Sequence, residues 1–156
     1  MLNEIQTTQN PVWGAGLIWR FTLGHQKHSG ENPGIALSFI VLPMLLHEDI
    51  RMHLASTQLG LNKFEEKFKK EYDLLTTIND RAVSLRELTR RSISIGIASR
   101  LFTIDVADAS ICPIAEKLPT YASADEQKLL NNAEKLGLWI GETSIHTVTR
   151  ILRLDF

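Results

Sequence analysis

Histidines are the first residues of this 156-residue chain whose types and spacing could do chemistry. His25 and His28 are spaced i, i+3, which could bind a metal, but the pair lies at the end of a predicted helix, where positive charge is favoured anyway. His47-Glu48 followed by His53 resembles the HExxH zinc motif, yet the second histidine comes about 240° around the helix from the first. The two rings cannot share a metal on one face, so we expect no metal site.

A cysteine is the second candidate for chemistry. Cys112 precedes Pro113 and could act as a nucleophile only if the fold brings a base beside it; the same limit applies to His146 beside Ser144. A small hydrolase that uses Cys112 and a histidine stays open as an alternative. Because no nucleophile, base and orienting group can be paired, and no phosphate-binding loop is present, we predict that the chain is not an enzyme and needs no cofactor.

Arginines form the third group. Between residues 81 and 100 there are five arginines and one acid, Glu87, which gives a local charge of +4 on a chain with a formal net charge of −1. Arg86 and Arg90 lie one helical turn apart. Two interpretations stay open: a solvated helix face, or a docking surface for an acidic partner or a DNA backbone. Residues 104–126, with five acids and one lysine, could instead neutralise the arginines within the fold.

The overall composition limits the class of protein. Of the residues, 44% are hydrophobic and 22% are charged, which is typical of a globular domain, and the nearly neutral charge lacks the bulk basicity of dedicated nucleic-acid binders. The single cysteine indicates a reducing compartment. No signal peptide or membrane span is expected, since the most apolar stretch, residues 35–46, is short and contains Pro43. We expect a cytoplasmic protein with a flexible segment at 1–9 and one helical domain at 10–156.

Hydrophobic periodicity and capping residues predict the elements that position these groups. Asn10-Pro11 should begin a largely apolar helix that ends near Gly24, in which Gly14 and Gly16 indicate close approach of another backbone. Residues 35–46 should form a buried helix that is kinked or broken near Pro43. The other expected elements are helices from about residues 48, 62, 79, 123 and 144, and a short hairpin within 102–120.

The predicted fold class is therefore mainly α: a compact single domain of about five to seven helices with one small β-hairpin. The hairpin also permits a winged-helix-like arrangement.

Three segments of the chain resemble a known family. NPVWGAGLIWRF (10–21) is followed by IALSFIVLPMLLHEDIRMHL (35–54), and the late KLGLWIGETSIHTVTRILRL (135–154) resembles the same family's closing helices. In order and spacing the sequence is similar to the middle component of three-component ABC-ATPase systems, the group that includes the Lamassu antiphage operons. The matching positions are packing residues and not catalytic ones: Asn10, Pro11, Gly14, Trp19, Arg20, Phe21, Leu42, Pro43, Leu45, Leu46 and His47.

The resemblance implies a non-catalytic subunit that holds an SMC-like ABC ATPase and an effector, often a nuclease, inactive until foreign DNA is sensed. Its partners would be those two proteins, with DNA reached only through the complex and with no membrane or small-molecule substrate. The candidate contact residues are Arg86, Arg90, Arg91, Trp13 and Trp19. The alternative is a freestanding DNA-binding regulator that uses residues 123–154 as a helix-turn-helix, although His146, Arg150 and Arg153 make its second helix only weakly basic.

Overall fold

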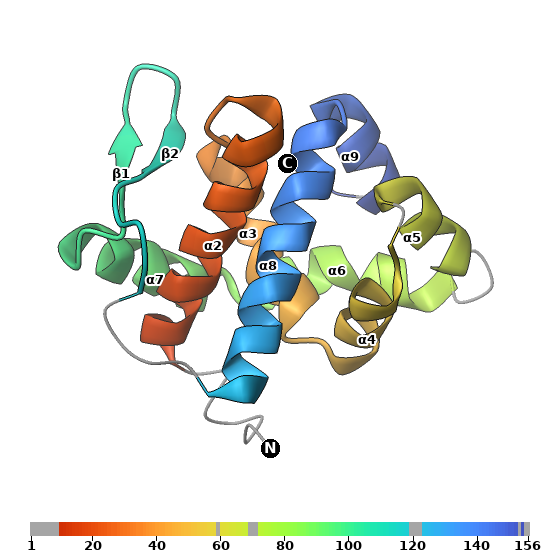
Figure 1. Ribbon diagram of the computed structural model, residues 1–156. Helices are drawn as coiled ribbons and strands as arrows, with labels where there is room; N and C mark the ends of the chain where they lie inside the picture. Colours follow the sequence, from red (N-terminus) through yellow and green to blue (C-terminus); the bar gives the residue numbers. More distant parts are fainter. Residues whose placement is uncertain (1–9, 59, 69–71, 119–122, 153, 155–156) are drawn as a thin grey trace.

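The computed structural model describes residues 10–58, 60–68, 72–118, 123–152 and 154, and these form a mainly helical domain with one hairpin (Figure 1). The expected flexible segment, 1–9, lies outside the described residues. In chain order the elements are α2 (Pro11–Ser29), the 3-10 helix η1 (Ile35–Leu37), α3 (Ser38–Leu45), α4 (Glu48–Ser56), α5 (Leu61–Phe68), α6 (Tyr72–Ser84), α7 (Arg86–Ala98), β1 (Phe102–Asp105), β2 (Ser110–Pro113), α8 (Ala124–Glu142) and α9 (Ile145–Leu152).

The mainly α fold class is confirmed, but the described residues contain eight α-helices instead of the expected five to seven. The extra helix arises within residues 61–98, where we expected one helix over 62–75 and a second from near Asn79. The structure has α5, α6 and α7 there, and Leu85 separates α6 from α7 with φ −97° and ψ 7°. Leu85 is partly buried and packs against the core, so tertiary packing accounts for the break.

The first helix begins where the sequence predicts and ends later. The Asn10 side chain accepts a hydrogen bond from the Val12 amide at 3.0 Å, and Pro11 occupies the first helical position. The helix continues through Gly24 to Ser29 and ends at Gly30, whose left-handed φ of 71° lets its amide bond to the Gln26 carbonyl. Gly24 therefore serves a purpose other than ending the helix.

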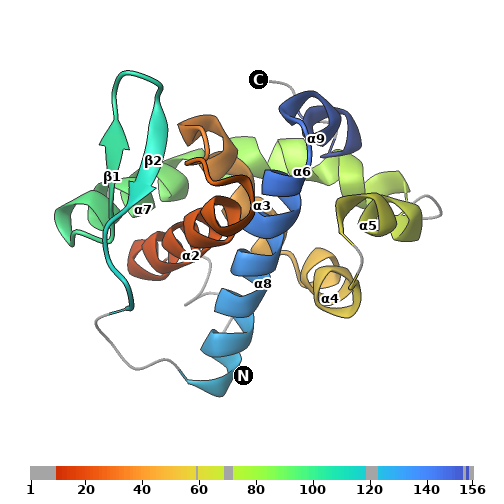
Figure 2. The same ribbon diagram turned by 45° about the horizontal axis from the view of Figure 1, so that its top comes forward.

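That purpose is the crossing of α2 and α8, which lie side by side at the centre of the molecule (Figures 1 and 2). A Cβ built on Gly24 would lie 2.1 Å from the carbonyl oxygen of Glu134, and one on Gly137 would lie 2.1 Å from that of Phe21. Gly141 is also close, at 2.9 Å from the His25 carbonyl. The two backbones therefore touch, which only glycine permits at these positions.

The opposite side of α2 packs against α7. A Cβ on Gly14 would lie 2.0 Å from the Ser92 hydroxyl of α7, so the close approach expected at Gly14 is present, but to a side chain and not to a backbone. Gly16 was expected to serve the same purpose, yet its nearest neighbour is Leu118 at 3.6 Å, an ordinary contact. The helix α2 is thus enclosed by α8 on one side and α7 on the other.

The helix α3 fills the centre of the core. Its residues Ile40, Val41, Leu42, Met44 and Leu45 are at most 1% exposed, which agrees with the predicted buried helix. The helix contains Pro43 and ends two residues after it, so the interruption that we expected near Pro43 falls at the end of α3. Largest among the other fully buried side chains are Trp19, Phe21, Phe64 and Phe102.

Lys135 joins α8 to the end of α4. Its ammonium donates hydrogen bonds to the carbonyls of Leu54, Ala55 and Thr57 at 3.3, 3.2 and 3.1 Å. These carbonyls lie at the carboxyl end of α4, where a helix lacks internal donors and carries partial negative charge. The lysine therefore caps a helix from another part of the chain.

The short hairpin expected within 102–120 is confirmed. Strands β1 and β2 are antiparallel, with Phe102 opposite Pro113 and Asp105 opposite Ser110. Ser110 also bridges Gly34, and the Ile111 amide bonds to the Pro33 carbonyl at 2.9 Å, so β2 is held on its other side by the loop that follows α2. The hairpin follows α7 directly, which keeps the winged-helix-like arrangement as an interpretation.

We predict that Gly137→Ala lowers the melting temperature by roughly 4–8 °C. Forcing α2 and α8 apart should cost about 1–3 kcal/mol, more than the helix propensity gained from alanine. Gly16→Ala is the matched control: its Cβ fits, so the gain in propensity should leave the melting temperature unchanged or raise it by about 2–4 °C. Thermal unfolding followed by circular dichroism measures both. Equal stability of the two variants would contradict the backbone contact.

Candidate partner-binding surface

The helix α7 presents an exposed basic side. Arg86, Arg90 and Arg91 are all exposed, as expected for a surface site. Arg81 precedes them on α6, where it is half-buried and donates from Nε to the Pro43 carbonyl at 3.4 Å. We call the exposed side chains of Arg86, Arg90, Arg91 and Arg100 the basic face.

Internal pairing neutralises little of the basic face. Arg91 bonds to Glu87, one turn away on the same helix, at 3.3 Å. Within the part of the chain that the structure describes, the side chains of Arg86, Arg90 and Arg100 have no hydrogen bond or ion pair. Three such cations are not neutralised within the described fold, so the solvated face and the docking surface both stay open as interpretations.

Three of the five acids within residues 104–126 have contacts elsewhere. Asp105 accepts a hydrogen bond from the Ala107 amide at 3.0 Å, and Asp108 accepts one from the Ser110 hydroxyl at 3.1 Å, so both shape the hairpin turn. Glu126 completes the capping box that begins α8 with Ser123, as the sequence predicted. None of these three contacts reaches the basic face.

Packing on its other side fixes the orientation of α7. Thr89, Ser92, Ile93 and Gly96 are buried against the rest of the domain. Gly96 is essential to this contact, because a Cβ there would lie 2.1 Å from the ring of Phe102 on β1. The small residues on the inner side of α7 let the helix lie close to the core. Its arginines are on the outer side and are exposed to solvent.

The two candidate tryptophans on α2 differ in position. Trp19 is 1% exposed and belongs to the core, where its indole N–H donates to the Ala115 carbonyl at 2.9 Å. It is not accessible to a partner on the folded chain, so the expectation of a surface role for Trp19 needs correction. Trp13 is only partly buried against the core, which leaves part of its ring available for contact.

The histidines do not assemble a metal site. Among the described residues, no group of three or more His, Cys, Asp or Glu side chains is placed to hold an ion. Burial lowers the pKa of His25, whose Nδ1 lies 3.0 Å from the Glu31 carbonyl oxygen, and burial also lowers the pKa of His47. His28 lies 3.6 Å from the Glu142 carboxylate on α8, and His53 Nδ1 lies 2.7 Å from the Asp49 carbonyl.

The helix-turn-helix alternative gains little from the structure. The second helix of that pair, α9, buries Val148, Ile151 and Leu152. Of its basic residues, Arg150 is exposed and lies 3.5 Å from the Glu65 carboxylate, which offsets its charge, and Arg153 lies outside the described residues. The exposed side of α9 is therefore a poor match to a DNA backbone.

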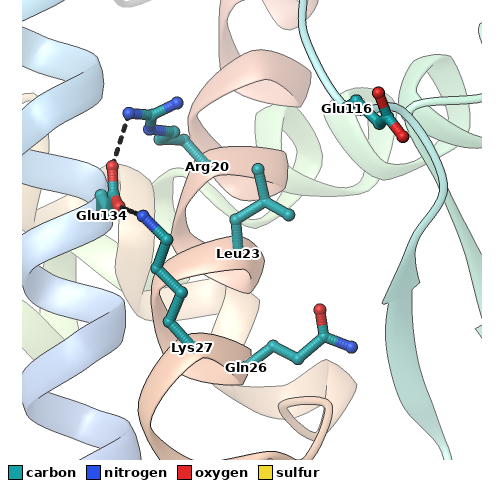
Figure 3. A pocket seen from close by; sticks show the side chains of 6 residues that line it. All are labelled: Arg20, Leu23, Gln26, Lys27, Glu116 and Glu134. Carbon is teal, nitrogen blue, oxygen red and sulfur yellow. Dashed lines mark hydrogen bonds and ion pairs between the residues drawn. The ribbon is translucent and has the colours of Figure 1, made fainter.

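Sequence reasoning missed a charged cluster where α2 crosses α8. Glu134 forms ion pairs with both Arg20 and Lys27, which lie on either side of Gly24, and Figure 3 shows its carboxylate between the two cations. Burial raises the pKa of Glu134, but the hydrogen bond from Lys27 and the charge of Arg20 outweigh it and hold that pKa below its ordinary value. No spacing rule links residues so far apart in sequence.

A shallow pocket of about 390 Å³ opens beside this cluster. It is lined by Arg20, Leu23, Gln26, Lys27, Glu116 and Glu134 (Figure 3). The two cationic side chains that line the pocket, Arg20 and Lys27, are already paired with the carboxylate of Glu134. We therefore interpret these residues as a clamp between helices and not as a ligand site.

Comparison with known families identifies the chain. The family model described as "ABC-three component (ABC-3C) system Middle Component 3" matches residues 1–156. The chain belongs to this family. No curated protein and no solved structure matches it.

Membership implies an accessory middle component of an ABC-3C defence system, whose partners are other components of such a system. The resemblance stated from the sequence is thus confirmed at the level of the ABC-3C middle component. In the described part of this middle component, no helix is both long enough and apolar enough to cross a membrane.

Glu134→Gln should destabilise the middle component at neutral pH. A carboxylate whose pKa is depressed in the folded state stabilises the fold above its unfolded pKa, and this contribution is lost as the pH falls through the folded pKa. We expect the free energy of unfolding to fall by only about 1 kcal/mol at pH 7, because the Glu134 carboxylate is partly solvated. Chemical denaturation at pH 7 and pH 3 measures the free energy of unfolding of the wild type and of the variant. The difference between the two proteins should be smaller at pH 3 than at pH 7. An equal difference at both pH values would contradict the clamp.

Cys112→Ala should leave assembly and biological activity intact. Cys112 is half-buried, and its sulfur accepts a hydrogen bond from the Asn32 side-chain amide at 3.2 Å, a group that cannot serve as a base. Protection of cells that carry the complete system, together with a melting curve, tests this. Loss of protection by a variant that folds and assembles normally would support the hydrolase alternative.

Proposed function

We propose that this middle component is a non-catalytic, cytoplasmic subunit of a Lamassu-type defence complex. It links an SMC-like ABC ATPase to an effector, a nuclease, and helps to hold the effector inactive until phage or plasmid DNA is sensed. The observation that carries the proposal is the family match along the whole chain, 1–156. A linking subunit needs two contact surfaces, and the described residues offer candidates for them.

The basic face supports a contact by charge. Arginine is enriched at protein interfaces because its planar guanidinium pairs with carboxylates in bidentate geometry while its stem packs on apolar surface. Arg86 and Arg90 are exposed and unpaired within the described residues, so both are available without breaking an internal contact. This face would bind one of the two partners.

Trp13 supports a second contact by shape. It is partly exposed near the start of α2, and Val12 beside it is 63% exposed. Large aromatic side chains beside exposed aliphatic ones are typical of the centre of an interface. The start of α2 would therefore bind the other partner.

Co-expression with the products of the neighbouring genes tests the function. We expect the ATPase, the effector and this chain to elute together on size exclusion. The ATPase and effector should not elute together when this chain is omitted. Co-elution of the ATPase and effector without the chain would contradict a linking role.

We predict that the double charge reversal Arg86→Glu, Arg90→Glu weakens the complex without unfolding the domain. Exposed positions tolerate substitution within about 0.5 kcal/mol, whereas truncating an arginine buried against a carboxylate costs about 2–5 kcal/mol. Co-purification, paired with a melting curve, measures both effects.

The control for this variant is Lys63→Glu, Lys128→Glu, which changes the net charge equally at exposed positions on α5 and α8. It should assemble like the wild type. If the double arginine variant melts normally, assembles fully and still responds to DNA, the basic face is only solvated, and the contact should be sought at Trp13.

A further inference from the structure

Arg100 occupies a backbone position that normally belongs to glycine. Its φ is 60°, in the left-handed region, immediately after α7. The Leu101 amide bonds to the Gly96 carbonyl at 2.9 Å and the Arg100 amide bonds to the Ile97 carbonyl at 3.1 Å, which together form a Schellman motif. A Cβ in this conformation crowds the following carbonyl oxygen, so arginine here destabilises the fold relative to glycine.

The same chain uses glycine at its comparable turn. Gly30, at the end of α2, has a φ of 71°. Among the described residues, a second residue that is not glycine shares this left-handed conformation, namely Ala109 in the hairpin turn with a φ of 50°. Strained positions that persist are a reason to look for a function, because the strain must be offset elsewhere.

The side chain of Arg100 does not itself offset the strain at this turn. Its side chain is exposed and, within the described residues, has no hydrogen bond or ion pair. By contrast, Arg91 on the same helix pairs with Glu87. The Schellman hydrogen bonds and the burial of Leu101 and Phe102 hold the turn, whereas the charge of Arg100 stays without a partner in the described fold.

The position of Arg100 extends the basic face along α7. At 100° per residue, Arg86, Arg90 and Ile97 lie within about 40° of one another on one edge of the helix and span about 16 Å. Ile97 is 41% exposed, and Arg100 follows it just beyond the last turn. The edge thus presents two arginines, one aliphatic side chain and a final arginine.

We propose that this edge, with Arg100 as its terminal anchor, binds an acidic amphipathic helix of a partner protein. The inference rests on the proposed function, because the partner would be another component of the complex. The four arginines of the basic face and Glu87 give a net charge of +3 that acidic side chains would complement. The exposed Ile97 between Arg90 and Arg100 offers an apolar contact, which a helix with acidic and aliphatic residues would complement.

The neighbouring hairpin disfavours duplex DNA as the occupant. Asp105 and Asp108 lie at the hairpin turn, three and six residues beyond Phe102, which itself contacts Gly96 of α7. At about 3.3 Å per residue, Asp105 is only about 10 Å from that contact. These carboxylates would repel the phosphates of a duplex that reached past the end of α7 to the hairpin, whereas a single helix is narrow enough to contact α7 alone.

The test is Arg100→Gly in the co-expressed complex. Glycine relieves the left-handed strain, so the melting temperature of the isolated chain should rise by about 2–4 °C. Affinity for the partner, measured by biolayer interferometry, should fall at least tenfold. A gain in stability with a loss of binding is a result that a merely structural residue would not produce.

Two matched variants separate charge from strain. Arg100→Lys keeps both the strain and the charge, so its melting temperature should match the wild type and its affinity should fall less than that of Arg100→Gly. Lys128→Ala removes one exposed charge from α8 and should leave the affinity unchanged. If the Arg100→Gly variant binds the partner like the wild type, this proposal is wrong, although the proposed linking function is not affected. A wild-type chain that joins no complex would overturn both.

A crosslink and a DNA titration identify the occupant. A photoreactive amino acid at Ser94, which is exposed on α7, should crosslink within the complex to a peptide whose acidic residues recur at helical spacing. A crosslinked peptide without acidic residues would overturn the proposal. Binding of a labelled 30-base-pair duplex to the isolated chain, if it is lost in Arg100→Gly, would also overturn it in favour of DNA.

Discussion

The contact between the backbones of α2 and α8 is the constraint on which the rest of the structure depends. Gly24 and Gly137 let the two helices touch, and the Glu134 carboxylate, held by two cations of α2, sits beside that point. Because α2 is enclosed on its other side by α7, and α8 also reaches α4 through Lys135, displacement of this crossing would disturb both halves of the domain (Figure 2).

The basic face follows from that arrangement. The inner side of α7 carries small residues because it must lie close to α2 and to the ring of Phe102. Its outer side is consequently held in one orientation, with arginines presented from a packed helix and not from a loop. Because the backbone of α7 is already ordered, binding through this face would have to order only its arginine side chains.

Capping residues in the sequence predicted where helices begin, because a helix start depends on neighbouring residues. The Asn10-Pro11 start and the Ser123 capping box were predicted correctly, because the atoms involved are within three residues of each other. The role of Gly24 was not predicted, since a glycine that ends a helix and one that admits another backbone look alike in sequence. The exposure of the arginines follows from their charge. The burial of Trp19 does not follow from its type, because aromatic residues are common both in cores and at interfaces.

Pairing α2 with α8 also has a consequence for synthesis on the ribosome. About 95 residues separate the end of α2 from the start of α8, so the largely apolar first helix emerges well before the helix that covers it. At 5–20 residues per second, this delay is roughly 5–20 s, far longer than collapse of a chain of this size takes. During that interval the apolar surface of α2 is open to aggregation or to chaperones. Production of the protein should therefore depend on growth temperature and translation speed more than its final stability would suggest.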